Sequence, residues 1–294
     1  MHAIGIDIGV TNIKSVVVTG EGRIVDEEST PTLSENPDWP GRVRSHLGEL
    51  MGRHGETEIV GVAAPGMAHP DGTHIWWMQG RLGEVQGLNW TEFLDLPRLV
   101  PVLNDAQAAL MGEVWQGAAR GAQTAILLTL GTGVGGAVIS EGRLLKGRLG
   151  RAGHLGHVSL DPEGPLDIVN TPGSLESAIG NCTVVERTGG RFGSTHELVA
   201  AHVAGDEFAT GVWVKSVTAL AAAVASLINV VDPEVVIIGG GIAASGAALF
   251  EPLGKFLDEF EWRPQGDGVR VVPAELGEHA GALGAAYNAM LAVR

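Results

Sequence analysis

Cysteine is almost absent from this sequence of 294 residues, because Cys182 is the only one. One cysteine excludes a disulfide within the chain and a zinc site built from several cysteines. We expect Cys182 to be a small buried apolar residue. Basic residues are also scarce, with 19 Lys and Arg against 34 Asp and Glu and a net charge of −15 at pH 7. This charge argues against nucleic acid or an anionic membrane as the main partner, because both attract cationic surfaces.

Long apolar runs are absent as well. The longest mainly apolar stretch, Val217 to Val231, is interrupted by Thr218, Ser226 and Asn229, so it is too short to span a bilayer and predicts a buried helix. The N-terminus has neither a basic region nor an apolar signal core, and Asp7 lies inside its first apolar stretch. We therefore expect a soluble, cytoplasmic protein.

What the chain does contain is a strand–turn–strand unit that occurs twice. The first copy runs from Ala3 to Val25 and the second from Ala125 to Leu145. Each copy has an apolar strand, a Gly-rich turn, a second apolar strand and a Glu-Gly-Arg turn before a further strand. Gly9 and Gly131 occupy equivalent places in the two Gly-rich turns and are 122 positions apart. The repeat predicts a duplicated domain, and a length of 294 residues with 45% apolar residues predicts two domains.

The remaining pattern alternates between helices and strands, which indicates an α/β protein with mixed sheets. Strands are predicted at residues 58–64, 100–103, 234–238 and 269–273, and helices at 39–52, 106–119, 197–204, 212–231, 247–259 and 280–292. Residues 67–98 and 148–176 are rich in turn-forming residues and have little periodicity, so we expect loops or irregular inserts there.

Both Gly-rich turns have the residues that a phosphate site needs. In the first, Gly9 lets the backbone approach, Thr11 can donate a hydrogen bond, and Asp7 can hold Mg²⁺ or its waters; a plain hairpin is the alternative interpretation. In the second, residues 131–136 match G-x-G-x-x-G, but a strand follows where a dinucleotide-binding fold requires a helix. We therefore interpret the second turn as a phosphate-binding hairpin.

Three further motifs each allow two interpretations. Glycines 239–241 follow a buried strand and either let a ribose or flat ring approach the backbone or only allow close packing of a helix. Asn104-Asp105 provides either a helix N-cap or a general base with Asn104 orienting the substrate. His154 and His157 can bind zinc only if acids such as Asp161 or Glu163 complete the site, and hydrogen bonds to a polyhydroxyl substrate are the favoured alternative.

Together these motifs resemble those of the ROK family (repressor, open reading frame, kinase), whose sugar kinases have the actin-like, hexokinase-like ATPase fold. The resemblance extends over essentially the whole chain, with the motifs in the family's order: residues 7–14, 64–66, 87–90, 104–106, 130–136, 147–157, 173–176, 232–241 and 276–286. It implies a duplicated fold of two domains with a central cleft. The smaller would be residues 1–104 joined by the C-terminal helix 280–294, and the larger residues 105–279.

The resemblance also implies an activity, namely ATP- and Mg²⁺-dependent phosphorylation of a sugar hydroxyl as in a glucokinase, by a homodimer. Asp105 would be the catalytic base and would contact the sugar together with Gly66, Asn89, Asn104, His154, His157 and Glu176. The nucleotide would be bound by Asp7, Gly9, Thr11, Asn12, Lys14, Gly131, Thr132, Gly133, Gly135, Gly240 and Gly241. Asp7 would hold Mg²⁺ through a water molecule.

The chain departs from the family pattern at two points. The family usually has Ala-Gly-Glu-x-Gly-His, and here His154 replaces the glutamate, so the choice of sugar is open. The cysteine cluster that usually binds zinc is missing, and residues 161–173 stand in its place, so we expect no structural zinc. A kinase for an amino sugar or a cyclitol, a non-catalytic sugar-binding regulator, and polyphosphate as the phosphoryl donor remain as alternatives.

Overall fold

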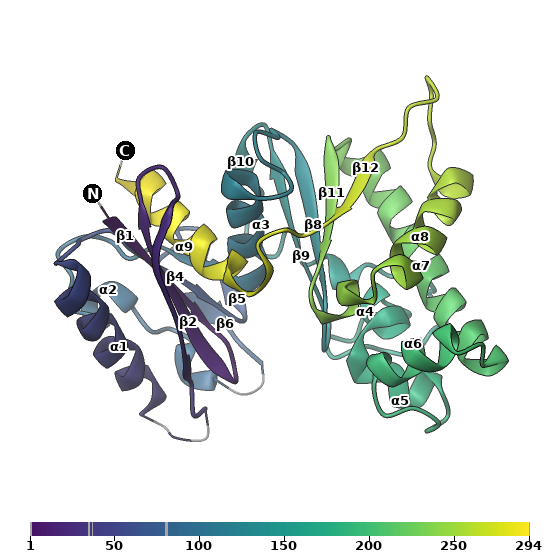
Figure 1. Ribbon diagram of the computed structural model, residues 1–294, viewed down its shortest axis with the longest axis horizontal. Helices are drawn as coiled ribbons and strands as arrows, with labels where there is room; N and C mark the ends of the chain where they lie inside the picture. Colours follow the sequence, from purple (N-terminus) through teal and green to yellow (C-terminus); the bar gives the residue numbers. More distant parts are fainter. Residues whose placement is uncertain (1, 35, 37, 80–81, 294) are drawn as a thin grey trace. The chain divides into compact units, whose positions relative to one another are not determined.

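The computed structural model describes residues 2–34, 36, 38–79 and 82–293, and its chain divides into two compact units. Unit 1 comprises Met1–Gly121, Leu144–Ala152 and Glu275–Arg294, and unit 2 comprises Ala122–Arg143 and Gly153–Ala274. The chain therefore leaves unit 1 twice and returns to it twice. Each unit is built around its own five-stranded sheet (Figure 1).

The sheet of unit 1 has the strand order β3-β2-β1-β4-β7. Its strands are β1 (His2–Ile8), β2 (Asn12–Thr19), β3 (Ile24–Pro31), β4 (Val60–Ala64) and β7 (Val102–Asn104). The first three form the predicted meander, with β1 antiparallel to β2 and β2 antiparallel to β3, whereas β4 runs parallel to β1 and β7 parallel to β4. The polar ends of β1 and β7 therefore lie at the same edge of this sheet.

Alternating side chains fill the two faces of this sheet differently. Ile4, Ile6 and Ile8 pack on one face with the apolar side of α1, whereas Ala3 and Val16 pack on the other with α9. This period of two is what a strand buried on both faces requires. The helices of unit 1 are α1 (Trp39–His54), α2 (Trp90–Phe93), α3 (Asp105–Gln116) and α9 (Ala280–Ala292), with 3₁₀ turns η1 (Gly83–Val85) and η5 (Gly277–His279) and a small hairpin of β5 (Met67–Ala68) and β6 (Ile75–Trp77).

Unit 2 repeats the same sheet topology, with the strand order β10-β9-β8-β11-β12. Its strands are β8 (Ala125–Leu130), β9 (Val134–Ser140), β10 (Arg143–Leu144), β11 (Val235–Gly239) and β12 (Arg270–Pro273). Again the first two are antiparallel, and β11 joins β8 in parallel and β12 joins β11 in parallel. The matching strand orders confirm the duplication predicted from the repeated strand–turn–strand unit.

The helices of unit 2 cover an apolar core formed with β8 and β11. They are α4 (Leu175–Ile179), α5 (Val184–Arg187), α6 (Thr195–Val203), α7 (Glu207–Val231) and α8 (Ala247–Phe260), with 3₁₀ turns η2 (Leu155–His157), η3 (Asn181–Thr183) and η4 (Gly241–Ser245). The predicted long helices and strands are confirmed within a few residues at their ends. The short elements β5, β6, α2, α4 and α5 were not predicted, because each is too short to show a period.

Helix α7 is the one helix, among the residues that the structure describes, long and apolar enough to cross a membrane. It begins one and a half turns before Val212, where the sequence predicted its start, and Asp206 caps its N-terminus by accepting a hydrogen bond from the Ala209 N–H. Half of its most apolar window is buried, and its side chains such as Trp213 and Leu220 belong to the core of unit 2. We therefore describe it as the core helix that the sequence predicted.

The predicted boundary after residue 104 needs correction, because α3 belongs to unit 1. Helix α3 packs against α9, and the contact is very close: a Cβ at Gly284 would lie 1.7 Å from the carbonyl oxygen of Ala108. Trp115 of α3 also stacks on Tyr287 of α9, with ring centroids 4.8 Å apart. The predicted association of the C-terminal helix with the N-terminal domain is retained, and it is this helix that holds α3 in the same unit.

Candidate functional site

Asn104 is fixed at the point where β7 ends and α3 begins. As the N-cap of α3, its Oδ1 accepts a hydrogen bond from the Ala106 N–H at 3.0 Å, and Oε1 of Gln107 accepts from the Asn104 N–H at 3.3 Å. Its Nδ2 donates to the carbonyl oxygen of Gly66 at 2.8 Å. The capping role therefore falls to Asn104, and Asp105 is the first residue of the helix.

Asp105 is exposed to solvent and uses Oδ1 to accept a hydrogen bond from the Ala106 N–H at 2.8 Å. Desolvation by the surrounding protein raises its pKa above the ordinary value, and the hydrogen bond from Ala106 opposes that rise. Because water reaches the carboxylate, screening limits the effect. A carboxylate with a raised pKa at an accessible helix start can accept a proton from a substrate hydroxyl.

Asp7 lies near Asp105 in unit 1 and is affected by its charge. Its carboxylate lies directly against the start of α9, since a Cβ at Gly281 would be 2.4 Å from Oδ2. Burial, followed by the negative charge of Asp105, raises the pKa of Asp7 to about 7, while Lys14 acts in the opposite direction. A carboxylate beside a second negative charge is the kind of oxygen donor that a divalent cation neutralises. Asp7 therefore fits Mg²⁺.

The first Gly-rich turn is closed by a hydrogen bond from the Gly9 N–H to the carbonyl oxygen of Asn12 at 2.9 Å. The hydroxyl of Thr32 donates to the carbonyl oxygen of Gly9 at 2.7 Å, and Thr11 at the tip is exposed. Lys14 pairs with Asp7 in the β1–β2 register, and its ammonium group forms an ion pair with Glu278 at 3.0 Å. The phosphate-binding residues predicted in this first turn and the predicted base thus belong to unit 1.

Two other predicted sugar contacts, Gly66 and Asn89, have structural tasks in unit 1. Gly66 has a φ of +102°, and a Cβ there would lie 2.8 Å from the carbonyl oxygen of Trp77, so glycine is required. Asn89 caps α2, with Oδ1 accepting from the Thr91 N–H at 3.1 Å and Nδ2 donating to Glu92 at 2.8 Å. The role of Asn89 toward a sugar stays a prediction.

In unit 2 the second Gly-rich turn is supported by η3. The Gly131 N–H donates to the carbonyl oxygen of Gly133 at 2.9 Å, the Asn181 N–H donates to that of Gly131 at 3.0 Å, and the Cys182 N–H donates to that of Thr132 at 2.8 Å. These bonds use the carbonyl groups of the turn and fix its backbone. A fixed turn of small residues is what close approach of a phosphate requires.

Glu176, which was predicted to contact the sugar, also reaches this turn. Its Oε2 accepts a hydrogen bond from the Val134 N–H at 2.9 Å. A Cβ at Gly133 would lie 2.2 Å from the same oxygen, so a side chain there would displace the carboxylate of Glu176. Gly135 lies on β9, paired with Thr129.

Beside this turn lies a cavity of about 710 Å³ in unit 2, lined in part by Gly131, Thr132 and Gly241. Its wall also includes Thr195, whose buried hydroxyl has no hydrogen-bond partner among the described residues. The neighbouring Gly240 has a φ of +85°, and a Cβ there would lie 2.3 Å from the carbonyl oxygen of Leu130. A buried hydroxyl without a partner beside accessible glycine backbone fits a nucleotide. The base or ribose could bond to the hydroxyl, and the phosphates could approach the glycines.

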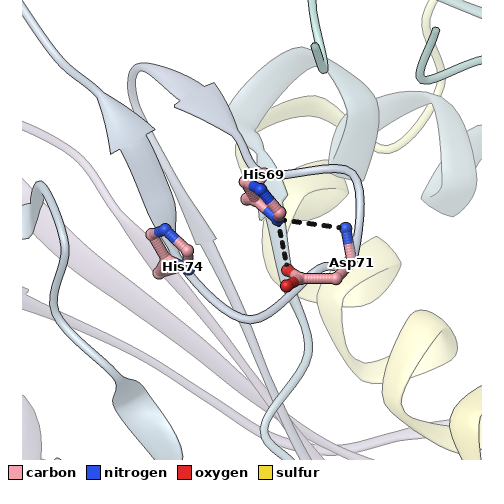
Figure 2. A group of neighbouring side chains, drawn as sticks. All are labelled: His69, Asp71 and His74. Atoms are coloured by element: carbon pink, nitrogen blue, oxygen red, sulfur yellow. Dashed lines mark hydrogen bonds and ion pairs between the residues drawn. The ribbon is translucent and has the colours of Figure 1, made fainter. Parts of the chain in front are cut away.

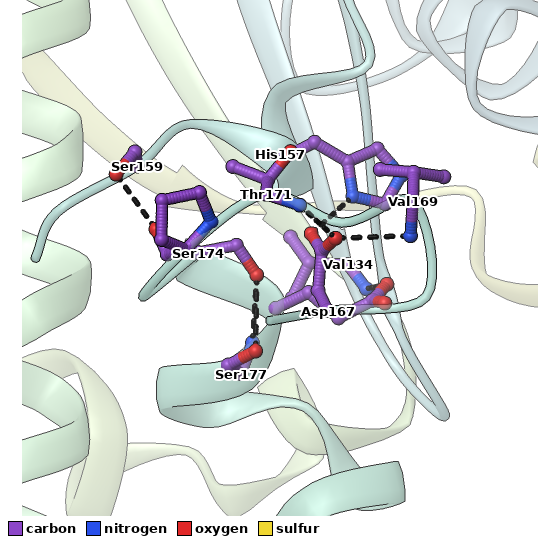
Figure 3. Close-up of polar contacts among 10 residues, drawn as sticks. Val134, His157, Ser159, Asp167, Val169, Thr171, Ser174 and Ser177 are labelled. Atoms are coloured by element: carbon purple, nitrogen blue, oxygen red, sulfur yellow. Dashed lines mark hydrogen bonds and ion pairs between the residues drawn. The ribbon is translucent and has the colours of Figure 1, made fainter. Parts of the chain in front are cut away.

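His157 is held by an aspartate from the segment that stands in place of the family's cysteines. Its Nδ1 lies 2.8 Å from Oδ2 of Asp167 (Figure 3). His154 is half-buried, and desolvation together with the neighbouring His157 lowers its pKa, so this ring is neutral at neutral pH. The two histidines therefore differ in their surroundings although they are three residues apart.

A second cavity in unit 2, of about 550 Å³, is lined by His157, Asp167 and Glu176 and by Thr132 of the Gly-rich turn. Cys182 also lines it and is exposed, so the expectation that this cysteine is buried is wrong. Its position in the surface turn η3, where its backbone supports Thr132, explains the exposure.

One group of potential metal ligands was not expected from the sequence. His69, Asp71 and His74, on the β5–β6 hairpin, have ligand atoms within 4.8 Å of one another, and no other group of three is found in the part of the chain that the structure describes (Figure 2). The His69 Nδ1 lies 2.8 Å from Asp71, and the two imidazole rings stack with centroids 5.0 Å apart and 13° between their planes. Lone pairs in nearly parallel planes do not converge, so this group is a hydrogen-bonded turn and not a preformed metal site. His154 and His157 do not belong to it.

Sequence reasoning missed Asp167 and Thr195. Asp167 lies in an irregular segment, and the only available signal was its position where the family's zinc ligands are lacking. Thr195 starts an ordinary helix, α6, and nothing in the local sequence marks its hydroxyl as buried and unsatisfied.

Comparisons with known proteins agree with this description. The model of the ROK family matches residues 3–291. The glucokinase of Thermotoga maritima is 33% identical over 97% of this chain and 96% of its own length. The crystal structure of the ROK hexokinase from Thermus thermophilus has a TM-score of 0.84 and 31% identity, covering 100% of this chain and 99% of that one. A ROK family glucokinase from Streptomyces griseus, in complex with glucose and AMPPNP, has a TM-score of 0.81 and 26% identity, covering 99% and 100%.

These matches extend over the whole chain, and they confirm the predicted actin-like, hexokinase-like fold. The chain therefore belongs to the ROK family and is a sugar kinase.

Proposed function

We propose that this protein transfers the terminal phosphoryl group of ATP to a hydroxyl group of a hexose, with Asp105 as the general base. The observation that carries the proposal is the start of α3, where hydrogen bonds fix Asn104 and the next residue, Asp105, has an accessible carboxylate. A general base needs a fixed position more than a large pKa shift, because alignment with the acceptor hydroxyl decides the rate. The capping box supplies that fixed position.

In the proposed reaction the acceptor hydroxyl donates its hydrogen bond to Asp105. As the oxygen bonds to phosphorus and the bond to the leaving phosphate breaks, the proton passes to the Asp105 carboxylate. The transition state is loose, so the proton moves late and alignment contributes most. Mg²⁺ would neutralise charge on the phosphates, and Asp7 is the residue that would hold it, through a water molecule.

The donor nucleotide is proposed to bind in the 710 Å³ cavity of unit 2. Gly131 and Thr132 would take the phosphates, and Gly240 and Gly241 would allow the adenosine end to approach the backbone. The unsatisfied hydroxyl of Thr195 supports this assignment, because a bound base or ribose would supply its missing partner. The AMPPNP complex of the Streptomyces griseus relative supports ATP over polyphosphate as the donor.

The sugar is proposed to be a hexose such as glucose, which is the ligand in the Streptomyces griseus complex. The residues proposed to contact its hydroxyl groups are Asn104, His157 and Glu176. His154 favours a second candidate, a kinase for an amino sugar or a cyclitol. A neutral imidazole replaces a carboxylate there, so it offers one acceptor where the family's glutamate offers two oxygens.

We further propose that the enzyme is cytoplasmic and dimeric, and that it does not bind nucleic acid. The single cysteine fits a reducing compartment, and a net charge of −15 disfavours contact with a polyanion. Dimerisation rests on family resemblance alone, and size-exclusion chromatography with light scattering measures it directly.

The function is tested by an ADP-release assay with MgATP over a panel of hexoses, amino sugars and cyclitols. We expect turnover with one class of sugar and its loss in Asp105→Asn, which keeps the hydrogen bond from Ala106. Repeating the panel with His154→Glu shows whether residue 154 selects the sugar, since a gain of glucose turnover would mark an amino-sugar or cyclitol kinase. If no sugar of the panel gives ADP release while the protein still binds ATP, the proposal is contradicted and a sugar-binding regulator is favoured.

A further inference from the structure

Asp167 is the centre of the segment 161–173. Its side chain is 1% exposed. One oxygen, Oδ1, accepts from the Val169 N–H at 3.0 Å and from the Thr171 N–H at 2.8 Å, and the other, Oδ2, faces Nδ1 of His157 at 2.8 Å (Figure 3). A buried carboxylate therefore has a defined donor for each of its oxygens.

The rest of the segment folds around this carboxylate through backbone hydrogen bonds. The Leu160 N–H donates to the carbonyl oxygen of Gly173 at 2.9 Å, and the Gly173 N–H donates to that of Pro165 at 2.8 Å. The hydroxyl of Ser159 donates to the carbonyl oxygen of Pro172 at 2.7 Å. These contacts define the position of Asp167 without any metal ligand.

The contact between Asp167 and His157 decides which nitrogen of the ring carries the proton. Desolvation raises the pKa of Asp167, but the hydrogen bonds from Thr171 and His157 outweigh it, so the pKa lies below its ordinary value. An ionised carboxylate only accepts hydrogen bonds, so Nδ1 of His157 must be the protonated nitrogen. In the neutral ring Nε2 then carries a lone pair and is an acceptor.

We propose that Asp167 is a positioning residue that holds His157 as the Nδ1–H tautomer, so that Nε2 accepts a hydrogen bond from a hydroxyl of the substrate. This inference rests on the proposed function. His157 is 27% exposed and lines the 550 Å³ cavity together with Glu176, another acceptor. The substrate must therefore offer hydroxyl donors on this side, and a group that only accepts is rejected there.

The variant Asp167→Asn tests the tautomer directly, because the orientation of the new amide is predictable. The N–H groups of Val169 and Thr171 need an acceptor, so the amide oxygen must take the place of Oδ1. The NH₂ group then faces His157 and donates to Nδ1, which forces the proton onto Nε2. The loop keeps its turn, while His157 changes from an acceptor to a donor toward the substrate.

Nitrogen NMR of the ¹⁵N-histidine-labelled protein distinguishes the two tautomers, with His157→Gln used to assign the signal. We expect the Nδ1–H form in the wild type and the Nε2–H form in Asp167→Asn. The matched control is Asp161→Asn in the same segment, since Asp161 also accepts a backbone N–H, from Glu163 at 3.0 Å. Its spectrum should match the wild type. An Nε2–H signal in the wild type overturns the proposal by itself, and an unchanged signal in folded Asp167→Asn also overturns it.

Kinetics supply the second readout. In Asp167→Asn we expect the KM for the sugar to rise about tenfold, the effect of one lost hydrogen bond, with a smaller change in kcat. In single-fluorine analogues of the sugar, the fluorine can accept a hydrogen bond but cannot donate one. The analogue with fluorine in place of the hydroxyl that contacts His157 should therefore be a poor substrate for the wild type. Asp167→Asn should discriminate less strongly between this analogue and the sugar. Equal discrimination by both proteins contradicts the proposal. The NMR result does not depend on turnover, so a failed kinase assay and a failed tautomer assignment are distinguishable.

Discussion

Asp105 and Asp167 are both hydrogen-bonded aspartates, but their surroundings fit them for opposite tasks. Asp105 has solvent access and a pKa raised by desolvation, which suits a group that accepts a proton during a reaction. Asp167 is buried and has a lowered pKa, which suits a group that stays an anion and orients a histidine. The number of donors around each carboxylate accounts for the difference.

Only one of these aspartates was predictable from the sequence. A short apolar strand followed by Asn104-Asp105 and a helix marks a carboxylate at the edge of a sheet, and the structure has that arrangement. Asp167 owes its character to hydrogen bonds from Val169, Thr171 and His157 in an irregular segment, and Thr195 owes its character to the burial of its hydroxyl. No local pattern carries that information.

His46 predicts a pH dependence of stability at the residue scale. Its Nε2 is 2.7 Å from the Ser15 hydroxyl, and burial lowers its pKa, with Glu28 acting in the opposite direction. Between the lowered folded pKa and the unfolded value of about 6.5 the unfolded chain binds more protons. The contribution of His46 is therefore complete above about pH 6.5 and is lost as the pH falls below it, by at most about 1.4 kcal/mol per pH unit.

Urea unfolding at several pH values measures this effect, with His46→Gln as the comparison because its amide can bond to Ser15 but does not titrate. The difference between the two stability curves should decrease on acidification below about pH 6.5. Parallel curves over that range would show that His46 is not the group responsible.

At the scale of elements, the repeat in the sequence predicted the duplication of the domain. Two copies of strand, Gly-rich turn and strand became two sheets of equivalent strand order, because each copy forms an antiparallel pair to which a later strand adds in parallel. The hairpin β5–β6 and helix α2 were beyond prediction, since they depend on contacts of an irregular stretch with its own unit.

The glycines of α9 give a prediction at this scale. Gly284 lies against the backbone of α3, with no room for a Cβ beside Ala108, so Gly284→Ala should destabilise the protein by about 1–3 kcal/mol through overpacking. The control is Gly254→Ala in α8, where a Cβ meets no atom within 4 Å, and a gain of about 0.5–1 kcal/mol is expected from helix propensity. Urea midpoints compare the two. Equal effects would mean that the close approach of α9 and α3 is not a constraint on folding.

At the scale of the whole molecule, the sequence indicated two domains but placed α3 in the wrong one. Helix α3 belongs to unit 1 because small residues on α3 and α9 let the two helices pack closely. The two helices are more than 150 positions apart, so no local stretch of sequence contains both. The division has a functional consequence. The proposed base belongs to unit 1, whereas every residue that lines the proposed nucleotide cavity belongs to unit 2.

Measuring turnover and nucleotide binding separately in Asp105→Asn tests the account most directly. Turnover with the accepted sugar is measured by ADP release, and the Kd for a non-hydrolysable ATP analogue is measured by calorimetry on the same preparations. The account predicts a fall in kcat on the order of 10²–10⁴ with an unchanged Kd. Wild-type turnover in the variant, or loss of nucleotide binding along with turnover, would contradict the assignment of Asp105 as the general base.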